Sequence, residues 1–295
     1  MILQTLEALP SWLASETGEA AWFFAYWGIL ALLAGLEFFI PAFQQPARRE
    51  RRWPTNLGMG VLSMLLAPLA PVSFVWGAQW AQTHEQGLLN QLGGPWWIAV
   101  TATFVIRSFV GYVTHFLTHK VPLLWRLHRV HHSDTHVDVT TTLRTHPLEL
   151  ALAFLILLPL TIAIGFTPWV LVVYEILHGV ADFLAHANLR LPEGLDRSLR
   201  WIFVTPNMHC LHHSSYQPET DSNYGQVFSV WDRLFGTYSS APRGGYDALE
   251  MGLKEVRDGR VDDLWWQIKS PALRIDRMRE QTAASAQKLF QSDSA

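Results

Sequence analysis

The sequence predicts an all-α integral membrane helical bundle, with four to five membrane-crossing or hairpin helices and a cytoplasmic cap rich in histidine. Three observations support this fold class. Hydrophobic residues make up 49% of the 295 residues and charged residues only 16%, whereas about 25% is usual in soluble proteins. The apolar residues gather in stretches that approach the ~20 residues needed to cross a bilayer. The basic residues fall between these stretches in an asymmetric pattern.

Three apolar stretches are each expected to cross the membrane once. They comprise residues 21–40, 57–80 and 96–117. The second stretch contains Pro68 and Pro71, and a proline inside a helix removes a backbone hydrogen bond and kinks or breaks the helix. We therefore expect a break within the second crossing.

A fourth apolar stretch, residues 148–184, is too long for a single crossing. The segment Gly165-Phe-Thr-Pro168 divides it into two arms, because glycine and proline interrupt helices. The prediction is a helical hairpin. This hairpin could cross the membrane twice or dip in and return, and the sequence supports both arrangements equally.

The distribution of lysine and arginine predicts the orientation, because loops on the cytoplasmic side are enriched in these residues. Residues 1–20, 83–94 and 165–168 contain no lysine or arginine. Of the 22 basic residues, all except Arg107 fall on the opposite side of the membrane, which predicts an outside N-terminus and a cytoplasmic cap. A bacterial-type inner membrane is the expected location. No basic stretch is built for nucleic acid, so nucleic acid is excluded as a partner.

The chain divides into three expected regions. Residues 1–94 form an N-terminal transmembrane region with two spans, residues 95–240 form a histidine-rich domain, and residues 241–295 form a polar cytoplasmic tail. Within the tail, Leu264-Trp-Trp266 and Ile268 are expected to lie along the membrane surface. The last ~15 residues are expected to be frayed.

Histidine is concentrated in one third of the chain. Twelve of the 13 histidines lie between His115 and His213, and eight of them form three clusters. The clusters read His115-Phe-Leu-Thr-His119, His128-Arg-Val-His131-His132 and His209-Cys-Leu-His212-His213. Imidazole is the commonest protein metal ligand, and spacings of three and four residues put two rings on one face of a helix. The clusters therefore predict a metal site at the cytoplasmic face.

The number of rings predicts two metal ions rather than one. Adjacent histidines diverge by about 100° on a helix, which suits two ions better than one. Eight rings fill four positions on each of two ions, or leave positions open if the ions take five or six ligands. Nitrogen-rich sites suit zinc, copper, iron and nickel alike, so the ligand type does not fix the metal.

Further polar residues lie on the second arm of the hairpin. His186 is expected to be a ninth ligand, and Asp182, one turn earlier, either orients a ring or ligates. His178 either joins this network or has a packing role. Glu175 and Arg107 sit at membrane depth, where an ionisable residue is usually functional, although a mutual ion pair is the alternative. Asp182, His178 and Glu175 are the catalytic candidates.

Seven segments between residues 95 and 240 resemble, in order and spacing, the fatty acid hydroxylase / sterol desaturase superfamily of integral membrane enzymes. They are residues 112–119, 124–133, 144–149, 186–188, 205–214, 223–225 and 231–238. The resemblance implies a di-iron enzyme that uses O2 and external electrons to oxidise unactivated C–H bonds of lipids. It therefore implies a lipid substrate and an electron-donor protein. Hydroxylation and desaturation both stay open, as do sterol, fatty acyl, ether lipid and carotenoid-like substrates.

The same resemblance implies that the eight clustered histidines are iron ligands and that His186 joins them. These residues are His115, His119, His128, His131, His132, His209, His212 and His213. Family members often have aspartate seven residues before the first histidine, where this chain has Ser108, and arginine directly after it, where this chain has Phe116. Some members have histidine in place of Asp182. These departures leave the clusters whole and bear on the surroundings of the ligands and on substrate choice.

Two other classes of membrane protein could use many histidines. An electron carrier would bind haem through paired histidines, but such ligands usually face each other within the bilayer core, whereas these rings gather at one face. A histidine-rich metal transporter would spread acids and histidines through several spans near the middle of the membrane. Glu175 and Arg107 are the ionisable residues that the sequence puts there.

Overall fold

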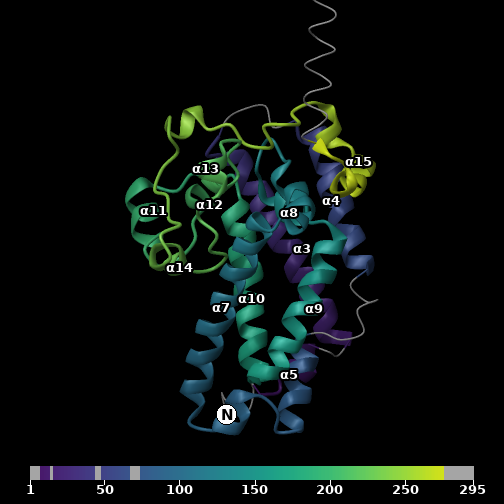
Figure 1. The fold of residues 1–295 in the computed structure, drawn as a ribbon, viewed down its shortest axis with the longest axis vertical. Helices are drawn as coiled ribbons and strands as arrows, with labels where there is room; N and C mark the ends of the chain where they lie inside the picture. The colour runs from purple at the N-terminus through teal and green to yellow at the C-terminus, as the bar shows by residue number, and fades with distance from the viewer. Residues whose placement is uncertain (1–6, 14–15, 44–47, 67–73, 276–295) are drawn as a thin grey trace, which may run out of the picture.

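The computed structural model describes residues 7–13, 16–43, 48–66 and 74–275, and within these ranges the chain is mainly helical and contains no strand (Figure 1). Together with its long apolar helices, this confirms the prediction of an all-α membrane helical bundle. Pro68 and Pro71, which were expected to break the second crossing, lie outside the described residues, as do the last ~15 residues, for which fraying was expected.

The long helices run along the long axis of the molecule (Figure 1). They are α3 (Glu16–Phe39), α4 (Arg49–Leu66), α5 (Phe74–Thr83), α7 (Trp96–Lys120), α9 (Pro147–Ile164) and α10 (Pro168–His186). Three of them, α7, α9 and α10, are long and apolar enough to cross a membrane, and α3 contributes a shorter apolar portion, Phe23–Phe39. The 18 residues of α9 give a length of about 27 Å at 1.5 Å per residue, close to the ~30 Å of a bilayer's hydrocarbon core.

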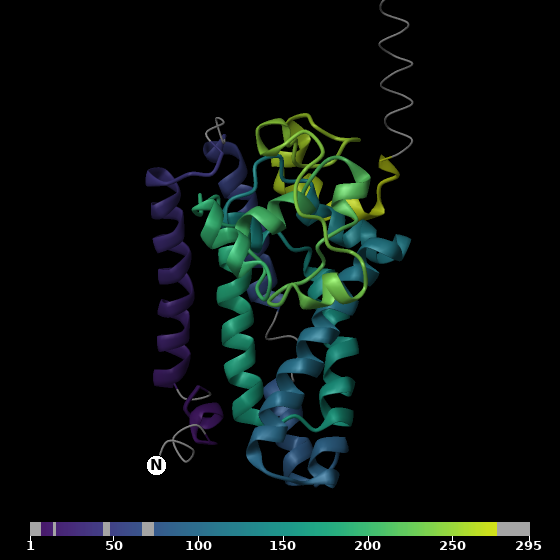
Figure 2. The ribbon, with the colours of Figure 1, turned by 90° about the vertical axis from the view of Figure 1, so that its left-hand side faces the viewer.

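Residues 147–186 form the predicted hairpin. Its two arms, α9 and α10, both run along the bundle (Figure 2). Gly165 ends α9 in the left-handed conformation, with φ of 72°, which glycine adopts without strain. A Cβ at this position would lie 2.8 Å from the side-chain nitrogen of Asn90, so the turn also packs closely. Pro168 is the first residue of α10, where its fixed φ favours a helix start.

The remaining helices mainly belong to a cap at one end of the bundle, and α2 and α6 lie at the other end (Figures 1 and 2). They are α2 (Leu9–Leu13), α6 (Leu88–Leu92), α8 (Pro122–His132), α11 (Glu193–Leu199), α12 (Pro206–His212), α13 (Gln217–Thr220), α14 (Val230–Leu234) and α15 (Leu264–Lys269). The 3-10 turns are η2 (Val139–Leu143), η3 (Tyr246–Ala248), η4 (Gly259–Asp262) and η5 (Ser270–Ala272). The hydrophobic contacts of Leu33, Val139 and Phe183 join α3, η2 and α10 below this cap.

Buried charges hold the cap onto α4. The Arg52 guanidinium donates to Asp134 at 2.5 Å and to Asp138 at 3.0 Å, and all three side chains are buried. Burial alone would raise the pKa of Asp134, but Arg52 holds that pKa below its ordinary value. Arg144, also fully buried, donates to Asn56 at 2.8 Å. The carboxylates of the two aspartates therefore pair with Arg52 of α4.

Candidate metal centre

The nine histidines selected from the sequence come from four helices and meet at the cap end of the bundle. They are His115 and His119 of α7, His128, His131 and His132 of α8, His186 of α10, and His209, His212 and His213 at the end of α12. Each residue is at most 8% exposed. Residues separated by almost 100 positions in the chain are thus packed ring against ring.

The rings fall into two groups that could each hold a metal ion. The five-ring group consists of His115, His119, His128, His132 and His212, and the four-ring group consists of His131, His186, His209 and His213. Within each group, one nitrogen from every ring lies within 4.8 Å of the others. The adjacent pairs of the second and third clusters are each divided between the groups, as the divergence of neighbouring side chains on a helix requires.

Two rings of the five-ring group show why a cation fits there. Nδ1 of His115 lies 2.8 Å from the carbonyl oxygen of Tyr224, and Nδ1 of His212 lies 2.7 Å from that of Ser222. A carbonyl oxygen only accepts, so both Nδ1 atoms donate, and a neutral imidazole has a single N–H. Both Nε2 atoms therefore carry lone pairs, yet they lie 3.0 Å apart. Two lone pairs repel at this distance unless a cation binds both.

The separations between nitrogens also fit coordination. Five Nε2–Nε2 pairs, each within one group, are 2.9–3.3 Å apart. Two nitrogens bound to one ion at about 2.1 Å and at right angles would be about 3.0 Å apart. The residues present therefore fit two metal ions, one in each group.

Two further rings have their Nδ1 atoms held. His128 donates to Oε1 of Glu149 at 2.7 Å, and His186 donates to the backbone carbonyl of Asp182 at 2.8 Å. Donation through Nδ1 leaves Nε2 free to bind a metal and fixes the orientation of the ring. Both Nε2 atoms point at other rings of their own group.

Several ring nitrogens have no hydrogen-bond partner among the described residues. They are Nδ1 of His131, His132, His209 and His213, and both nitrogens of His119. Nδ1 of His119 lies 3.6 Å from a carboxylate oxygen of Asp221, too far for a hydrogen bond. Buried polar atoms are normally paired, and a metal ion in the five-ring group would supply a partner for one nitrogen of His119. The four unpaired Nδ1 atoms lie on the far side of rings whose Nε2 atoms face their group, so a metal bound through Nε2 would not pair them.

The electrostatics favour the neutral form of the rings. Burial lowers the pKa of His131, His132 and His213 well below the ordinary value of 6.5, and neighbouring rings lower it further. Burial has the same effect on the pKa values of His209 and His212. A metal binds the neutral ring, so the site is prepared for coordination at neutral pH.

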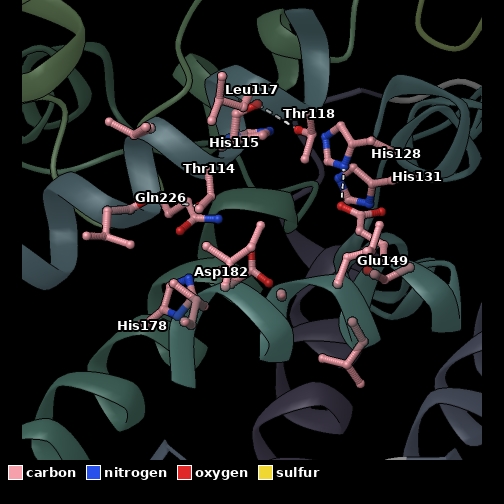
Figure 3. Close-up of a pocket in the computed structure, with 18 of the residues that line it drawn as sticks. Thr114, His115, Leu117, Thr118, His128, His131, Glu149, His178, Asp182 and Gln226 are labelled. Atoms are coloured by element: carbon pink, nitrogen blue, oxygen red, sulfur yellow. Dashed lines mark hydrogen bonds and ion pairs between the residues drawn. The ribbon is translucent and has the colours of Figure 1, made fainter. Parts of the chain in front are cut away.

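A cavity of about 600 Å³ adjoins the rings and extends between the long helices (Figure 3). His115, His128 and His131 line its cap end. Much of its wall is apolar and comes from α7, α8 and α9, with residues that include Val110, Val113, Leu117, Leu124, Leu150 and Ile156. The α10 wall is polar, since Glu175, His178 and Asp182 line it in succession.

The three catalytic candidates differ in their surroundings. Glu175 accepts from Arg107 at 2.7 Å, so the ion pair considered for these two residues is present. Nδ1 of His178 lies 3.5 Å from Glu175. The carboxylate of Asp182 lies 3.4 Å from Nδ1 of His186, whose N–H is already directed at the backbone carbonyl of Asp182. The backbone carbonyl of Asp182 is therefore the closer acceptor for His186, while its carboxylate lies beside the same nitrogen and lines the cavity (Figure 3).

The residues that hold the ring nitrogens are not among those selected from the sequence. Glu149 lies in a segment that carries the family resemblance, but no spacing links it to His128, 21 residues earlier. Tyr224 and Ser222 act through backbone carbonyls, which no residue type reveals. Another histidine, His146, lies outside both groups and accepts from the backbone N–H of Leu148 at 3.1 Å, where α9 begins.

Comparisons with known proteins agree with this geometry. Residues 100–237 match the fatty acid hydroxylase family. This part of the chain is a domain of the fatty acid hydroxylase type. The region that matches includes all nine histidines of the two groups, so this domain and the candidate metal centre coincide.

Three relatives give the range of similarity. Ornithine lipid hydroxylase OlsE of Rhizobium tropici is 30% identical over 197 residues, which cover 64% of this chain and 52% of that protein. Alkylglycerol monooxygenase of Xenopus tropicalis is 32% identical over 143 residues, covering 48% and 30%. The human alkylglycerol monooxygenase is 28% identical over 246 residues, covering 80% and 50%. The chain thus spans about half or less of the lengths of these relatives, and no solved structure matches this chain.

Proposed function

We propose that this protein is a membrane-bound oxygenase that hydroxylates or desaturates an unactivated C–H position of a lipid, with two iron ions, O2 and external electrons. The observation that carries the proposal is the contact between two groups of buried imidazoles and a largely apolar cavity. A site that only stored metal would have no need of such a cavity. The match to a family of lipid-acting enzymes supports the same conclusion.

The nine imidazoles would hold the ions, five rings on one and four on the other. Iron is among the metals that imidazole suits. When bound, the irons would supply the activation of O2 and the oxidation of the C–H bond, which is chemistry of the cofactor rather than of the protein. The protein's part is to keep the rings oriented, and four Nδ1 donors to oxygen serve this purpose, on His115, His128, His186 and His212.

The apolar wall of the cavity would bind the hydrocarbon part of the lipid and exclude water. Leu117 of α7 and Ile156 of α9 line the cavity and are also exposed, so we expect the chain of the lipid to enter from the bilayer between these helices. Holding one carbon beside the metals supplies much of the rate, since effective molarities from positioning reach roughly 10⁵ M or more.

The three catalytic candidates line the polar wall of the cavity, and we infer a separate role for each of them. The carboxylate of Asp182, which faces the cavity near the rings, would accept a hydrogen bond from a hydroxyl or amine group of the substrate. Glu175 is neutralised by Arg107, so this pair would shape the deep end of the cavity. His178, between them on α10, would contact the same polar part of the substrate.

The relatives narrow the reaction and the substrate. Their names describe hydroxylases and monooxygenases, which favours hydroxylation over desaturation. They are named for ornithine lipid and alkylglycerol, and both are lipids with polar groups that donate hydrogen bonds. A lipid of this kind would place its chain on the apolar wall and its polar group on Asp182.

We further propose that the cap faces the cytoplasm of a bacterial-type inner membrane, because the basic residues concentrate at the cap end. Electrons would come from a separate donor protein on that side. The two alternative functions have less support. A haem carrier needs rings separated by a flat porphyrin, whereas here the Nε2 atoms are packed about 3 Å apart. A transporter needs unpaired ligands along the spans, and Glu175 is paired with Arg107.

Mass spectrometry of membrane lipids tests the function. Cells that express the protein should contain a lipid species heavier by one oxygen, or lighter by two hydrogens, and cells that express His212→Ala should lack it. The purified iron-loaded protein should form the same product from that lipid with O2 and a chemical reductant. The proposed function is wrong if two results are found together. Membranes of cells that express the unchanged protein and of cells that express His212→Ala would contain identical lipids, and the purified protein would consume no O2.

A further inference from the structure

The cap carries a concentration of exposed apolar side chains on two segments, residues 195–203 and 230–235, which we call the apolar lobe. These side chains are Leu195, Leu199, Trp201, Ile202, Phe203, Val230, Leu234 and Phe235. Leu234 is 67% exposed and Trp201 is 65% exposed. An exposed patch that contains several large apolar residues usually marks a contact with a protein or a membrane.

The two segments of the apolar lobe form one continuous surface. The backbone N–H of Ser229 donates to the carbonyl oxygen of Ile202 at 2.9 Å. The guanidinium of Arg233 lies over the ring of Trp201, 4.4 Å from its centroid, and donates to the carbonyl oxygen of Arg200 at 2.9 Å. The two segments are therefore held together as a unit.

The apolar lobe is attached to a membrane-crossing helix, far from the end of that helix. Trp231 of α14 donates through Nε1 to Ser108 of α7 at 3.0 Å, and its ring lies 5.0 Å from that of Phe109. Phe235 stacks on Tyr112 at 5.4 Å. All three α7 residues precede the last two turns of that helix, so α14 lies beside the membrane-crossing part of α7 rather than above it (Figure 1).

The depth of α14 follows from the length of α7. Trp96 and Trp97 are exposed at the far end of α7, where tryptophan typically marks the membrane interface. At 1.5 Å per residue, Phe109 and Tyr112 lie about 18 and 22 Å along the helix from Trp97. The hydrocarbon core is about 30 Å thick, so the contacts with α14 fall roughly 8–12 Å inside its cap-side boundary.

We propose that the apolar lobe is inserted into the cap-side leaflet and binds lipid through its exposed face. Its surface continues the lipid-exposed surface of α7, and its depth agrees with the roughly 5–10 Å at which interfacial helices insert. A protein partner would have to displace lipid at this depth. In the sequence, α12, with His209 and His212, lies between the two segments of the lobe, so insertion would anchor the chain on both sides of the third histidine cluster.

The opposite side of the cap provides a matched comparison. Trp265 of α15 is 67% exposed, as is Leu234. This helix was expected to lie along the membrane surface, but α15 lies farther from the membrane-crossing part of the bundle than α14 does (Figure 1). Trp266 packs on Val256 and Val261 instead, so part of the apolar face of α15 is covered by the cap itself. We therefore assign the membrane contact to α14 and not to α15.

Spin labels on single added cysteines test this assignment in the full chain reconstituted in phosphatidylcholine–phosphatidylglycerol nanodiscs. The variants are Leu234→Cys, Ile202→Cys and Trp265→Cys, and the wild-type chain serves as the labelling blank because its single Cys210 is buried. Electron paramagnetic resonance then measures how often each label collides with O2, which is enriched in bilayers, and with a water-soluble nickel chelate.

We expect labels at 202 and 234 to collide with O2 several-fold more often than with the nickel chelate, and the label at 265 to show the reverse. Similar chelate accessibility at all three positions would overturn the proposal. Protection of 202 and 234 from both reagents would also overturn it, because the surface would then be covered by protein. Helix content measured by circular dichroism checks that each labelled variant is folded. The outcome does not depend on the enzyme's activity, so it stands apart from the proposed function.

Discussion

The five-ring group and the four-ring group use the same side chain but hold it in different ways. In the five-ring group, His115, His128 and His212 donate through Nδ1 to oxygens from other parts of the chain. In the four-ring group, His186 does so, and its acceptor is a carbonyl of its own helix. The orientation of the remaining four-ring residues depends on packing alone among the described residues.

This difference teaches that the two metal sites need not be equivalent. A ring whose second nitrogen is held loses less freedom when it binds a metal, so the site is better prepared. The five-ring group also offers one more ligand. We therefore expect it to bind its ion more tightly, and the four-ring group, with fewer ligands and looser rings, to leave more room for O2 and substrate.

The adjacent residues His212 and His213 give the most severe test, because they belong to different groups. Replacing either by alanine should reduce turnover by more than the ~10–100-fold typical of residues that support a ligand. His213→Ala leaves three rings and should lose about one iron per chain, whereas His212→Ala leaves four and should retain more. Metal analysis and turnover measure both effects. Equal iron loss in the two variants would remove the distinction between the groups.

Glu149 should have a smaller effect, confined to the five-ring group. Glu149→Ala removes the acceptor for Nδ1 of His128 and should weaken one of two iron affinities by ~10–100-fold. Glu149→Gln keeps an oxygen that can accept the hydrogen bond from His128, so this variant should lose less iron affinity than Glu149→Ala. Titration of the metal-free protein with ferrous iron measures both affinities. An unchanged affinity in Glu149→Ala would show that packing alone orients the five-ring group.

Asp182 should have the smallest effect and should leave both metals in place, because its backbone carbonyl is a closer acceptor for His186 than its carboxylate is. Asp182→Asn should raise KM for a lipid with a hydroxyl or amine group by about tenfold, which corresponds to roughly 1.5 kcal/mol for a hydrogen bond to a charged group. A lipid without such a group should show no change. Iron loss in Asp182→Asn would instead mean that the carboxylate orients His186.

The membrane helices and the convergence of histidines could be predicted because both depend on local spacing. The hairpin could be predicted from Gly165 and Pro168, because each of these residues affects the backbone at its own position: Gly165 ends α9 and Pro168 begins α10. Adjacent histidines diverge on any helix, which is why His131 and His132 point into different groups.

The surroundings of the rings could not be predicted because they depend on contacts between distant segments. Asp134 stands two residues after a cluster, yet it faces Arg52 of α4. The acceptor for His115 is a backbone carbonyl 109 residues later in the chain. The membrane contact was expected at α15 from its tryptophans, whereas the depth of α14 follows from its packing on α7. Composition alone contains none of this information.

Metal content with iron X-ray absorption of the purified protein tests the central claim most directly. The account predicts two irons per chain, each surrounded by nitrogen or oxygen ligands at about 2.1 Å, with a scattering pattern typical of several imidazoles. A protein that is folded and active with one metal ion or none per chain would contradict it, as would sulfur or porphyrin scattering around the iron.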